Sequence, residues 1–528
     1  MSQANASSAR LAQRIPVFLL SAFLIFVGLA AIAWLSLSIT QNPVIQLAWQ
    51  GSDSQENTQT PSLIVAFLLE LGFILPILTL GFGLTFVWMG LKLRTGNIQT
   101  ARWVQSALVW LAVIAGLGIL YQLFLMISPA LFRTAATETV PHQERVLVIG
   151  VLALLLPFLV IGLLWLNRNL EMVFSGKELL NAKEVRFAWN LLIPTLLVFA
   201  LVAARPLEQT FIRSLTDKRF ASQQVPNFVG LENYRSLLSL RLDVVGCRIK
   251  EGVEGCATAP NGDIQWQSID SEPLQAGFRT VWRVRLPFSN PPIALAVSGL
   301  DRDFLQAIGT TLVFVVFSVS LELVVALFIA VTVNSSFRGR TLMRAVMLVP
   351  WAIPTVISAK LWSLMLKDTS AGIINRVLMD LQLIDAPQAW LSVAALQIPA
   401  AIMVDVWKTS AFMSLLLLAG LQMIPKDLYE ASSVDGATPI QQFFLITLPL
   451  LRPTIAVALV FRTLDALRVF DLFNVLFGRQ QLSMATYNYE MLVNSQKDGY
   501  ASAVSIIIFL LISIFAVIYV RMLRVEAE

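Results

Sequence analysis

Histidine and cysteine are almost absent from this chain of 528 residues, which contains one histidine, His142, and two cysteines. A His/Cys metal site needs several such ligands together, so we expect no metal site. Charged residues are also few, at 13% of the chain against 57% hydrophobic residues. Soluble globular domains carry about 25% charged residues, so this composition excludes that class. The net charge of +5 does not predict nucleic-acid binding, because cytoplasmic loops of membrane proteins accumulate Lys and Arg.

The sequence also lacks the signatures of two kinds of enzyme. It contains no Gly-x-x-x-x-Gly-Lys-Ser/Thr loop, so we expect neither ATP nor Mg²⁺ to bind this chain. A membrane-bound glycosyltransferase, a remote alternative, would need catalytic carboxylates or a metal-binding acidic cluster in a water-exposed loop. Residues 206–303, the longest polar segment, offer no such cluster. We therefore predict no catalytic residues and no enzymatic activity.

Long hydrophobic runs are abundant instead. A helix needs roughly 18 or more apolar residues to cross ~30 Å of hydrocarbon at ~1.5 Å per residue. Ten runs meet this length, at residues 15–39, 62–91, 103–128, 145–166, 187–205, 304–334, 342–366, 395–424, 446–477 and 500–521. The pattern predicts an all-α polytopic membrane protein with about ten spanning helices.

The distribution of Lys and Arg between the spans predicts the orientation. Residues 40–61 contain no Lys or Arg, whereas the next loop, 92–102, contains Lys92, Arg94 and Arg102. The same alternation continues along the chain, and basic loops remain on the cytoplasmic side of membranes. We therefore expect a plasma (inner) membrane protein in contact with lipid, with both termini in the cytoplasm.

Segment 206–303 then lies on the extracytoplasmic side. Asn261-Gly262 is typical of a β-hairpin turn, and Trp282, Val284 and Leu286 alternate with arginines, as in a strand. The segment also contains both cysteines, Cys247 and Cys256. An oxidising exterior favours a disulfide between them, which would contribute roughly 2–3 kcal/mol to a small module. Two unpaired thiols are the alternative.

The polar stretch from Glu430 to Pro453 interrupts two of the most apolar runs. Glu430, Ala431, Gly436 and then Ile446-Thr447-Leu448-Pro449 stand at the spacing of the coupling loop of ABC importer permeases. Ser432 is the one departure from that pattern. A short helix followed by glycine, which permits a tight turn, suits a structure that docks into another protein. The alternative is an ordinary loop between two membrane helices.

Other motifs extend this resemblance over somewhat more than half of the chain. Phe228-Val229-Gly230-Leu231, Leu348-Val349-Pro350-Trp351, Ala419-Gly420-Leu421-Gln422 and the run from Phe461 to Asp471 are similar to those of maltose/trehalose-type carbohydrate importer permeases. The long N-terminal extension resembles that of the permease for the osmoprotectant glucosylglycerol. Gly478-Arg479-Gln480 departs from the Gly-Gly-Pro that such permeases often have.

The resemblance implies a type I ABC importer permease fold with a small β-containing extracytoplasmic insertion. It also implies partners: a second homologous permease subunit, two ATPase subunits that bind ATP and Mg²⁺, and an extracytoplasmic sugar-binding protein. The ATPase-coupling residues would be Glu430, Ala431, Asp435 and Gly436. The substrate would be a small glucoside or compatible solute such as glucosylglycerol, trehalose or sucrose, with maltose-type oligosaccharides as the alternative.

Charges within the spans are the second informative feature, because each is unfavourable by ~2.5–3.5 kcal/mol at mid-bilayer. Asp405 and Lys408 are three residues apart, as are Asp465 and Arg468, so each pair shares a helix face. Such pairs either bind sugar hydroxyls beside aromatic rings or hold helices together. The family resemblance implies a sugar site made of Lys408, Thr409, Phe412, Phe461, Leu464, Asp465 and Arg468. Glu322 and Arg462 are interpreted as packing or lining charges.

These features divide the chain into four parts. They are an N-terminal extension with four spanning helices at residues 1–186, a first core helix at 187–205, the extracytoplasmic loop domain at 206–303, and a permease core at 304–528 with five helices and the coupling loop at 426–450.

Overall fold

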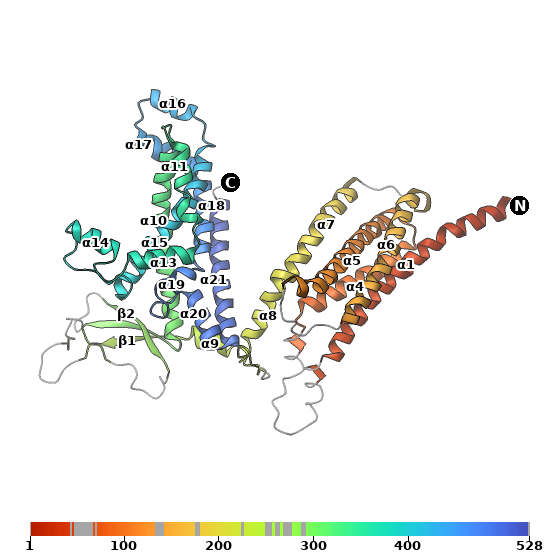
Figure 1. The fold of residues 1–528 in the computed structure, drawn as a ribbon, viewed down its shortest axis with the longest axis horizontal. Coiled ribbons are helices and arrows are strands. Elements are labelled where there is room, and N and C mark those ends of the chain that lie inside the picture. Colours follow the sequence, from red (N-terminus) through yellow and green to blue (C-terminus); the bar gives the residue numbers. More distant parts are fainter. Residues whose placement is uncertain are drawn as a thin grey trace, which may run out of the picture. The chain divides into compact units, whose positions relative to one another are not determined.

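The computed structural model describes residues 2–42, 45–46, 67–68, 71–132, 142–174, 180–222, 226–248, 256–258, 264–267, 277–286 and 292–525. The chain forms two compact units, residues 1–212 and residues 213–528. The predicted first core helix, 187–205, falls within the first unit. Figure 1 shows both units.

The first unit consists of long apolar helices. They are α1 (Ser2–Gln41), α4 (Ile74–Leu93), α5 (Ile98–Phe132), α6 (His142–Val173) and α7 (Leu180–Phe199), followed in the chain by the π-helical turn η1 (Ala200–Ala204) and α8 (Arg205–Ser214). α1 and α4 approach closely at their glycines. A Cβ added to Gly28 would lie only 2.5 Å from the carbonyl oxygen of Gly83. Ser21 Oγ also donates to the carbonyl oxygen of Gly90 at 2.7 Å. Small residues at a helix contact are typical of membrane helix pairs.

The second unit carries the motifs. Its N-terminal part contains α9 (Glu232–Leu238) and the strands β1 (Leu240–Gly246), β2 (Arg279–Arg285) and β3 (Ile293–Gly299). The helices that follow are α10 (Arg302–Asn334), α11 (Arg340–Val346), α12 (Val349–Ala352), α13 (Thr355–Met365), α14 (Ile373–Asp380) and α15 (Ala394–Leu421). The remaining elements are α16 (Asp427–Val434), α17 (Pro439–Gln442), η3 (Phe443–Thr447), α18 (Leu448–Ala466), α19 (Asp471–Leu476), α20 (Met484–Tyr489), η4 (Glu490–Asn494) and α21 (Asp498–Val525).

The two ends of the second unit differ. Figure 1 shows α16 and α17 at one end of the long helices and the β-sheet at the other. The sheet is antiparallel, with strand order β1-β3-β2. Between these ends, α10, α13, α15, α18 and α19 bury an apolar core in which the Phe314 and Phe473 rings meet edge to face at 5.2 Å. The predicted all-α membrane fold with a small sheet is confirmed.

Within the described residues, nine helices are long and apolar enough to cross a membrane, or ten if one bent pair is a single span. That pair, Arg340–Ala352 and Thr355–Met365, meets at 90°. The predicted span over 342–366 is therefore a bent pair of helices with a break after Ala352. Ile353 and Pro354 have extended backbone there, because proline disfavours helical conformation in the residue before it.

The predicted span 446–477 is also not one helix. The helical stretch runs from Pro439 to Ala466, and α19 begins separately at Asp471. Asp465 and Arg468 therefore do not share a helix, although they are three residues apart. This correction affects the predicted sugar site, since Arg468 lies in the connection between α18 and α19.

Asp301 fixes the start of α10 at the sheet end of the unit. Its carboxylate accepts hydrogen bonds from the backbone N–H of Phe304 at 2.9 Å, from the hydroxyl of Tyr500 at 2.6 Å and from the hydroxyl of Tyr487. Burial raises the pKa of Tyr487, so this phenol stays protonated and donates. α10 therefore begins at a fixed position relative to α20 and α21.

Cys247 and Cys256 form a disulfide, with their Cα atoms 5.5 Å apart. Backbone hydrogen bonds connect the residues next to this disulfide. Arg248 N donates to Gln265 O at 2.8 Å, and Ala257 N donates to Arg248 O at 2.8 Å. The predicted turn at 261–262 lies outside the described residues.

The disulfide is open to a direct chemical test. Cys247 is 3% exposed, so even a free thiol there would react slowly in the folded protein. The protein is therefore unfolded in detergent before labelling. If the disulfide is present, maleimide should label neither cysteine without reductant and both cysteines after reduction. Mass spectrometry gives the count. Two labelled cysteines before reduction would contradict the pairing.

Candidate functional site

The predicted coupling segment begins as a short helix that ends at a glycine. α16 contains Glu430, and Gly436, just after the helix, has a φ of +81°. This left-handed conformation favours glycine and turns the chain at the helix end. Thr438 then starts α17 with a capping box, in which its side chain and that of Gln441 each bond the other's backbone N–H. The segment is thus a defined helix–turn–helix.

Gln442 holds the two halves of this segment together. Its Nε2 donates to Ser432 Oγ at 3.0 Å, Ser433 Oγ at 2.8 Å and the Tyr429 carbonyl oxygen at 3.3 Å. The Tyr429 hydroxyl bonds Thr447 Oγ1 at 2.9 Å. Ser432, the departure from the motif, therefore supplies a hydrogen bond that an alanine could not.

The surface of the coupling segment is left uncovered by the described residues of this chain. The four predicted coupling residues are all exposed; they are Glu430, Ala431, Asp435 and Gly436. Val434 and Ile440 beside them are 88% and 71% exposed. Large apolar side chains on a rigid, protruding element are typical of a protein docking surface.

A charge network lies between α10, α15 and α18. The Arg462 guanidinium donates through Nη2 to Glu322 Oε1 at 2.8 Å, through Nη1 to Asp465 Oδ2 at 3.1 Å, and also to Asp405. Ser318 Oγ donates to Asp405 Oδ2 at 2.5 Å. One buried cation thus connects carboxylates from three helices, which ties the helices together at this level.

The structure corrects one of the predicted pairings. Asp405 bonds Arg462 and Ser318, whereas Lys408 Nζ donates to the carbonyl oxygen of Trp351 at 3.2 Å. The Asp405–Lys408 ion pair considered from the sequence is therefore absent from the described part of the chain. Lys408 remains within electrostatic range of Asp405 and Asp465.

The predicted sugar residues of α15 differ in availability. Phe412 stacks on the Trp351 ring, with centroids 5.5 Å apart and an angle of 14° between planes. Thr409 Oγ1 bonds Glu322 Oε1 and the carbonyl oxygen of Asp405, so its hydroxyl belongs to the charge network. Lys408 is half-buried. This helix offers an aromatic pair and an ammonium group, with the threonine behind them.

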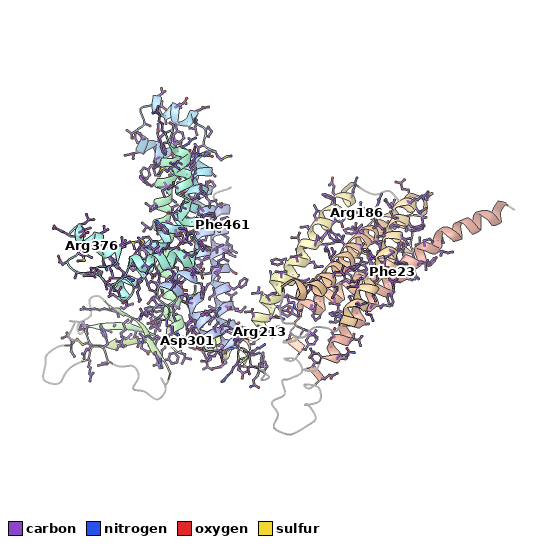
Figure 2. All side chains as sticks on the ribbon, viewed as in Figure 1. Phe23, Arg186, Arg213, Asp301, Arg376 and Phe461 are labelled. Atoms are coloured by element: carbon purple, nitrogen blue, oxygen red, sulfur yellow. A yellow bond between two sulfur atoms is a disulfide. The ribbon has the colours of Figure 1, made fainter. Side chains whose placement is uncertain are left out.

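The predicted sugar residues of α18 and its C-terminal connection are more exposed. Phe461 is 60% exposed and lies between the sheet end and α16, whereas Asp301 lies at the sheet end (Figure 2). Leu464 is half-buried. Asp465 pairs with buried Arg462 at 3.1 Å and with exposed Arg468 at 3.8 Å. A carboxylate and a guanidinium beside a ring match the hydroxyls and the apolar face of a sugar.

The sequence analysis interpreted Glu322 and Arg462 as packing or lining charges and did not find their shared network. The signal was present, because a charge within an apolar run needs a partner. Its partners could not be identified, since Arg462 and Glu322 are 140 residues apart in the chain. Among the described residues, no group of three or more His, Cys, Asp or Glu is arranged to hold a metal ion.

The long apolar helices of the described residues define a polytopic membrane protein. The family model described as "Binding-protein-dependent transport system inner membrane component" matches residues 322–524. A trehalose/maltose transport system permease protein of Thermococcus litoralis is 43% identical over 233 residues, which are 43% of this chain and 77% of that protein. The chain belongs to this family of binding-protein-dependent inner membrane permeases.

Two further relatives show a similar extent of matching. A trehalose transport system permease protein of Mycobacterium tuberculosis is 34% identical over 43% of this chain and 73% of its own length. A sulfoquinovosyl glycerol transport system permease protein of Agrobacterium fabrum is 34% identical over 43% of this chain and 74% of its own length. The predicted resemblance to carbohydrate importer permeases is confirmed.

Proposed function

We propose that this chain is the permease subunit of an ATP-driven importer of small glucosides or compatible solutes. The observation that carries the proposal is the exposed segment from Glu430 to Gly436, at the opposite end of the second unit from the sheet. Two ATPase subunits, which hold ATP and Mg²⁺, would dock there. A second permease subunit and an extracytoplasmic sugar-binding protein would complete the complex, and this chain itself would catalyse no reaction.

We infer the orientation in the membrane from the same segment. Cytoplasmic ATPases need the coupling segment on the cytoplasmic side, so the sheet would face the exterior. The basic loops predict this orientation independently, and it places the Cys247–Cys256 disulfide in an oxidising compartment. Both termini would then be cytoplasmic.

The sugar site would lie beside the charge network. Lys408, Phe412, Phe461, Leu464, Asp465 and Arg468 would contact the substrate, and Thr409 would orient Glu322 behind them. Relatives are named for trehalose, maltose and sulfoquinovosyl glycerol transport. These are polyhydroxylated compounds, so the proposal favours glucosylglycerol, trehalose or sucrose over longer maltose-type oligosaccharides. Uptake of radiolabelled glucosides of one to four rings into proteoliposomes would rank them.

Asp465→Asn separates a substrate role from a structural one. Arg462 keeps Glu322 and Asp405 as partners, so we expect normal complex yield and normal ATPase activity with the binding protein. Uptake should fall roughly five- to tenfold, because a charge-assisted hydrogen bond of ~1.5–3 kcal/mol becomes a neutral bond of ~0.5–1.5 kcal/mol. Yield, ATPase rate and uptake are measured on the same preparations.

Phe412→Ala is the matched control for this variant. It removes the ring that stacks on Trp351 and strands no charge, so uptake should fall while yield is preserved. A drop in the yield of Asp465→Asn before any change in uptake would assign Asp465 a structural role. Full uptake by both variants would place the substrate path elsewhere.

A further inference from the structure

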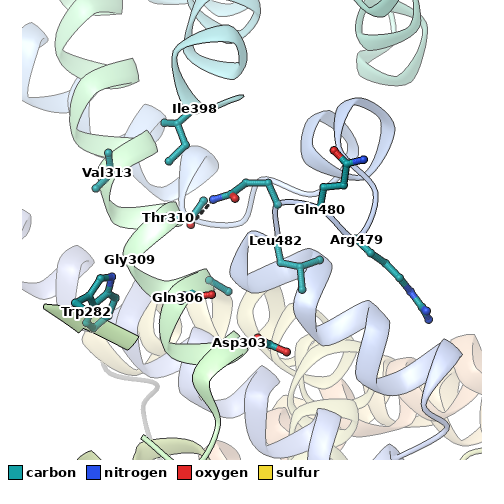
Figure 3. Close-up of a pocket in the computed structure, with 12 residues that line it drawn as sticks. Trp282, Asp303, Gln306, Gly309, Thr310, Val313, Ile398, Arg479, Gln480 and Leu482 are labelled. Atoms are coloured by element: carbon teal, nitrogen blue, oxygen red, sulfur yellow. Dashed lines mark hydrogen bonds between the residues drawn. The ribbon is translucent and has the colours of Figure 1, made fainter. Parts of the chain in front are cut away.

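A cleft opens at the sheet end of the second unit, apart from the predicted sugar residues. It has a volume of about 570 Å³, within the range of small-molecule sites, ~300–1,000 Å³. We name it the sheet-end cleft. Its lining comes from β2, α10, α15 and the loop before α20, and includes Trp282, Asp303, Gln306, Thr310, Ile398, Arg479, Gln480 and Gln481 (Figure 3).

Trp282 is held as an aromatic wall of this cleft. The pairing of β2 with β3 shifts register between Thr280 and Trp282, and such a bulge redirects the side chain that follows it. The indole lies against α10 at Gly309, where an added Cβ would be 2.6 Å from Trp282 Cζ2. Trp282 is nevertheless 40% exposed. It therefore presents a fixed apolar face to the cleft.

Polar groups from two elements line the rest of the cleft. Asp303, Gln306 and Thr310 follow one another along α10, while Arg479 and Gln480 come from the loop before α20 (Figure 3). Gln481 Nε2 donates to Thr310 Oγ1 at 2.8 Å, and Arg479 pairs with Glu490. The exposed Asp303 carboxylate has no hydrogen-bond or ion-pair partner within the described residues. The cleft thus offers fixed donors and a carboxylate acceptor.

This combination matches a neutral polyhydroxylated ligand. Aromatic rings bind the C–H face of a sugar, while carboxylate and amide groups bind its hydroxyls. Arg479 is already paired with Glu490, so the cleft carries no excess positive charge, and the Asp303 carboxylate disfavours an anionic ligand. Ile398 in the cleft and Lys408 are ten residues apart on α15, or about 15 Å along the helix.

We propose that the sheet-end cleft is a second saccharide subsite, occupied by a neutral glucoside before it reaches the helices at Lys408 and Asp465. Trp282 stacks on one sugar ring, and Asp303, Gln306 and Gln480 bond its hydroxyls. This inference rests on the proposed function as a glucoside importer. It adds a first binding site at the face where a substrate-delivering protein would release its sugar.

The test uses the assembled complex in proteoliposomes and trehalose carrying a diazirine group. Photolysis should label residues 302–313 or 479–482, and Trp282→Ala should lose this label while Trp282→Phe keeps it. Losing a stacking contact of ~0.5–1.5 kcal/mol should raise the KM for trehalose uptake roughly two- to tenfold with little change in kcat. Complex yield of each variant reports folding.

Labelling confined to α15 and α18, together with a wild-type KM in Trp282→Ala, would overturn the subsite. Photolabelling needs no transport, so it remains decisive if the wild-type complex takes up no glucoside. In that case the proposed function fails, while label in the cleft still supports a saccharide site and its absence contradicts one. If Trp282→Ala assembles poorly, Gln306→Ala should show the same loss of label, and full labelling of that variant would contradict the proposal.

Discussion

Replacing Arg462 with methionine is expected to prevent recovery of a stable chain. The Arg462 side chain is 5% exposed and neutralises Glu322, which is 0% exposed, and Asp405. Without the guanidinium, these carboxylates are left unpaired within the membrane-spanning helices. Removing one partner of a buried ion pair destabilises by about 3–5 kcal/mol. Thermal unfolding of the detergent-purified complex and its monodisperse yield provide the measurement.

Arg468→Met is the matched control, because that side chain is 71% exposed and pairs with Asp465 at 3.8 Å. Exposed pairs contribute about 0–1 kcal/mol, so its Tm should stay near the wild-type value. A triple variant, Glu322→Gln, Asp405→Asn and Arg462→Met, removes the three buried charges of this network and should regain stability relative to Arg462→Met. A wild-type Tm for Arg462→Met would show that the network does not hold these helices.

Gly436→Asp is expected to abolish uptake while the chain still folds. An added Cβ at Gly436 meets no atom within 4 Å, so the substitution creates no clash within this chain. The left-handed backbone adds about 1–2 kcal/mol of strain for a non-glycine residue. The larger effect would come from a carboxylate placed where we propose that an ATPase subunit docks. Uptake and ATPase activity of the purified complex are measured together.

Gly436→Asn is the control, since asparagine has nearly the same shape, tolerates a left-handed conformation and carries no charge. We expect it to retain part of the uptake, with ATPase activity coupled to transport. If Gly436→Asp assembles with its ATPases and transports at the wild-type rate, the coupling segment lies elsewhere. Equal loss in both variants would assign the effect to backbone strain.

The sequence predicted the features that depend on local or repeated patterns. Apolar runs such as 304–334 predict long membrane helices because length and composition alone decide spanning. The spacing from Glu430 to Pro449 predicted a helix and a turn. Gly436 has the positive φ that such a turn requires. Alternation at Trp282 and Val284 predicted a strand, which is β2.

Features that depend on tertiary contacts could not be predicted in the same way. Pairing charges by their separation in the chain suggested Asp405 with Lys408, whereas Arg462 reaches Asp405 across 57 residues. α18 ends at Ala466 although the apolar pattern continues, and Leu467, Leu472 and Phe473 beyond it are buried in the core formed with α13 and α15. The sheet-end cleft likewise depends on β2 packing against α10.

Active accumulation of sugar tests the central claim most directly. The complex of this chain with its second permease and ATPases is reconstituted into proteoliposomes with ATP inside the ATPase-bearing compartment. Radiolabelled trehalose and its binding protein are added on the opposite side. We predict accumulation in the ATP compartment above the external concentration, dependent on both ATP and binding protein. Equilibration without ATP would indicate a channel, and conversion of the sugar to a lipid-linked product would indicate a transferase; either result would contradict an ATP-driven importer.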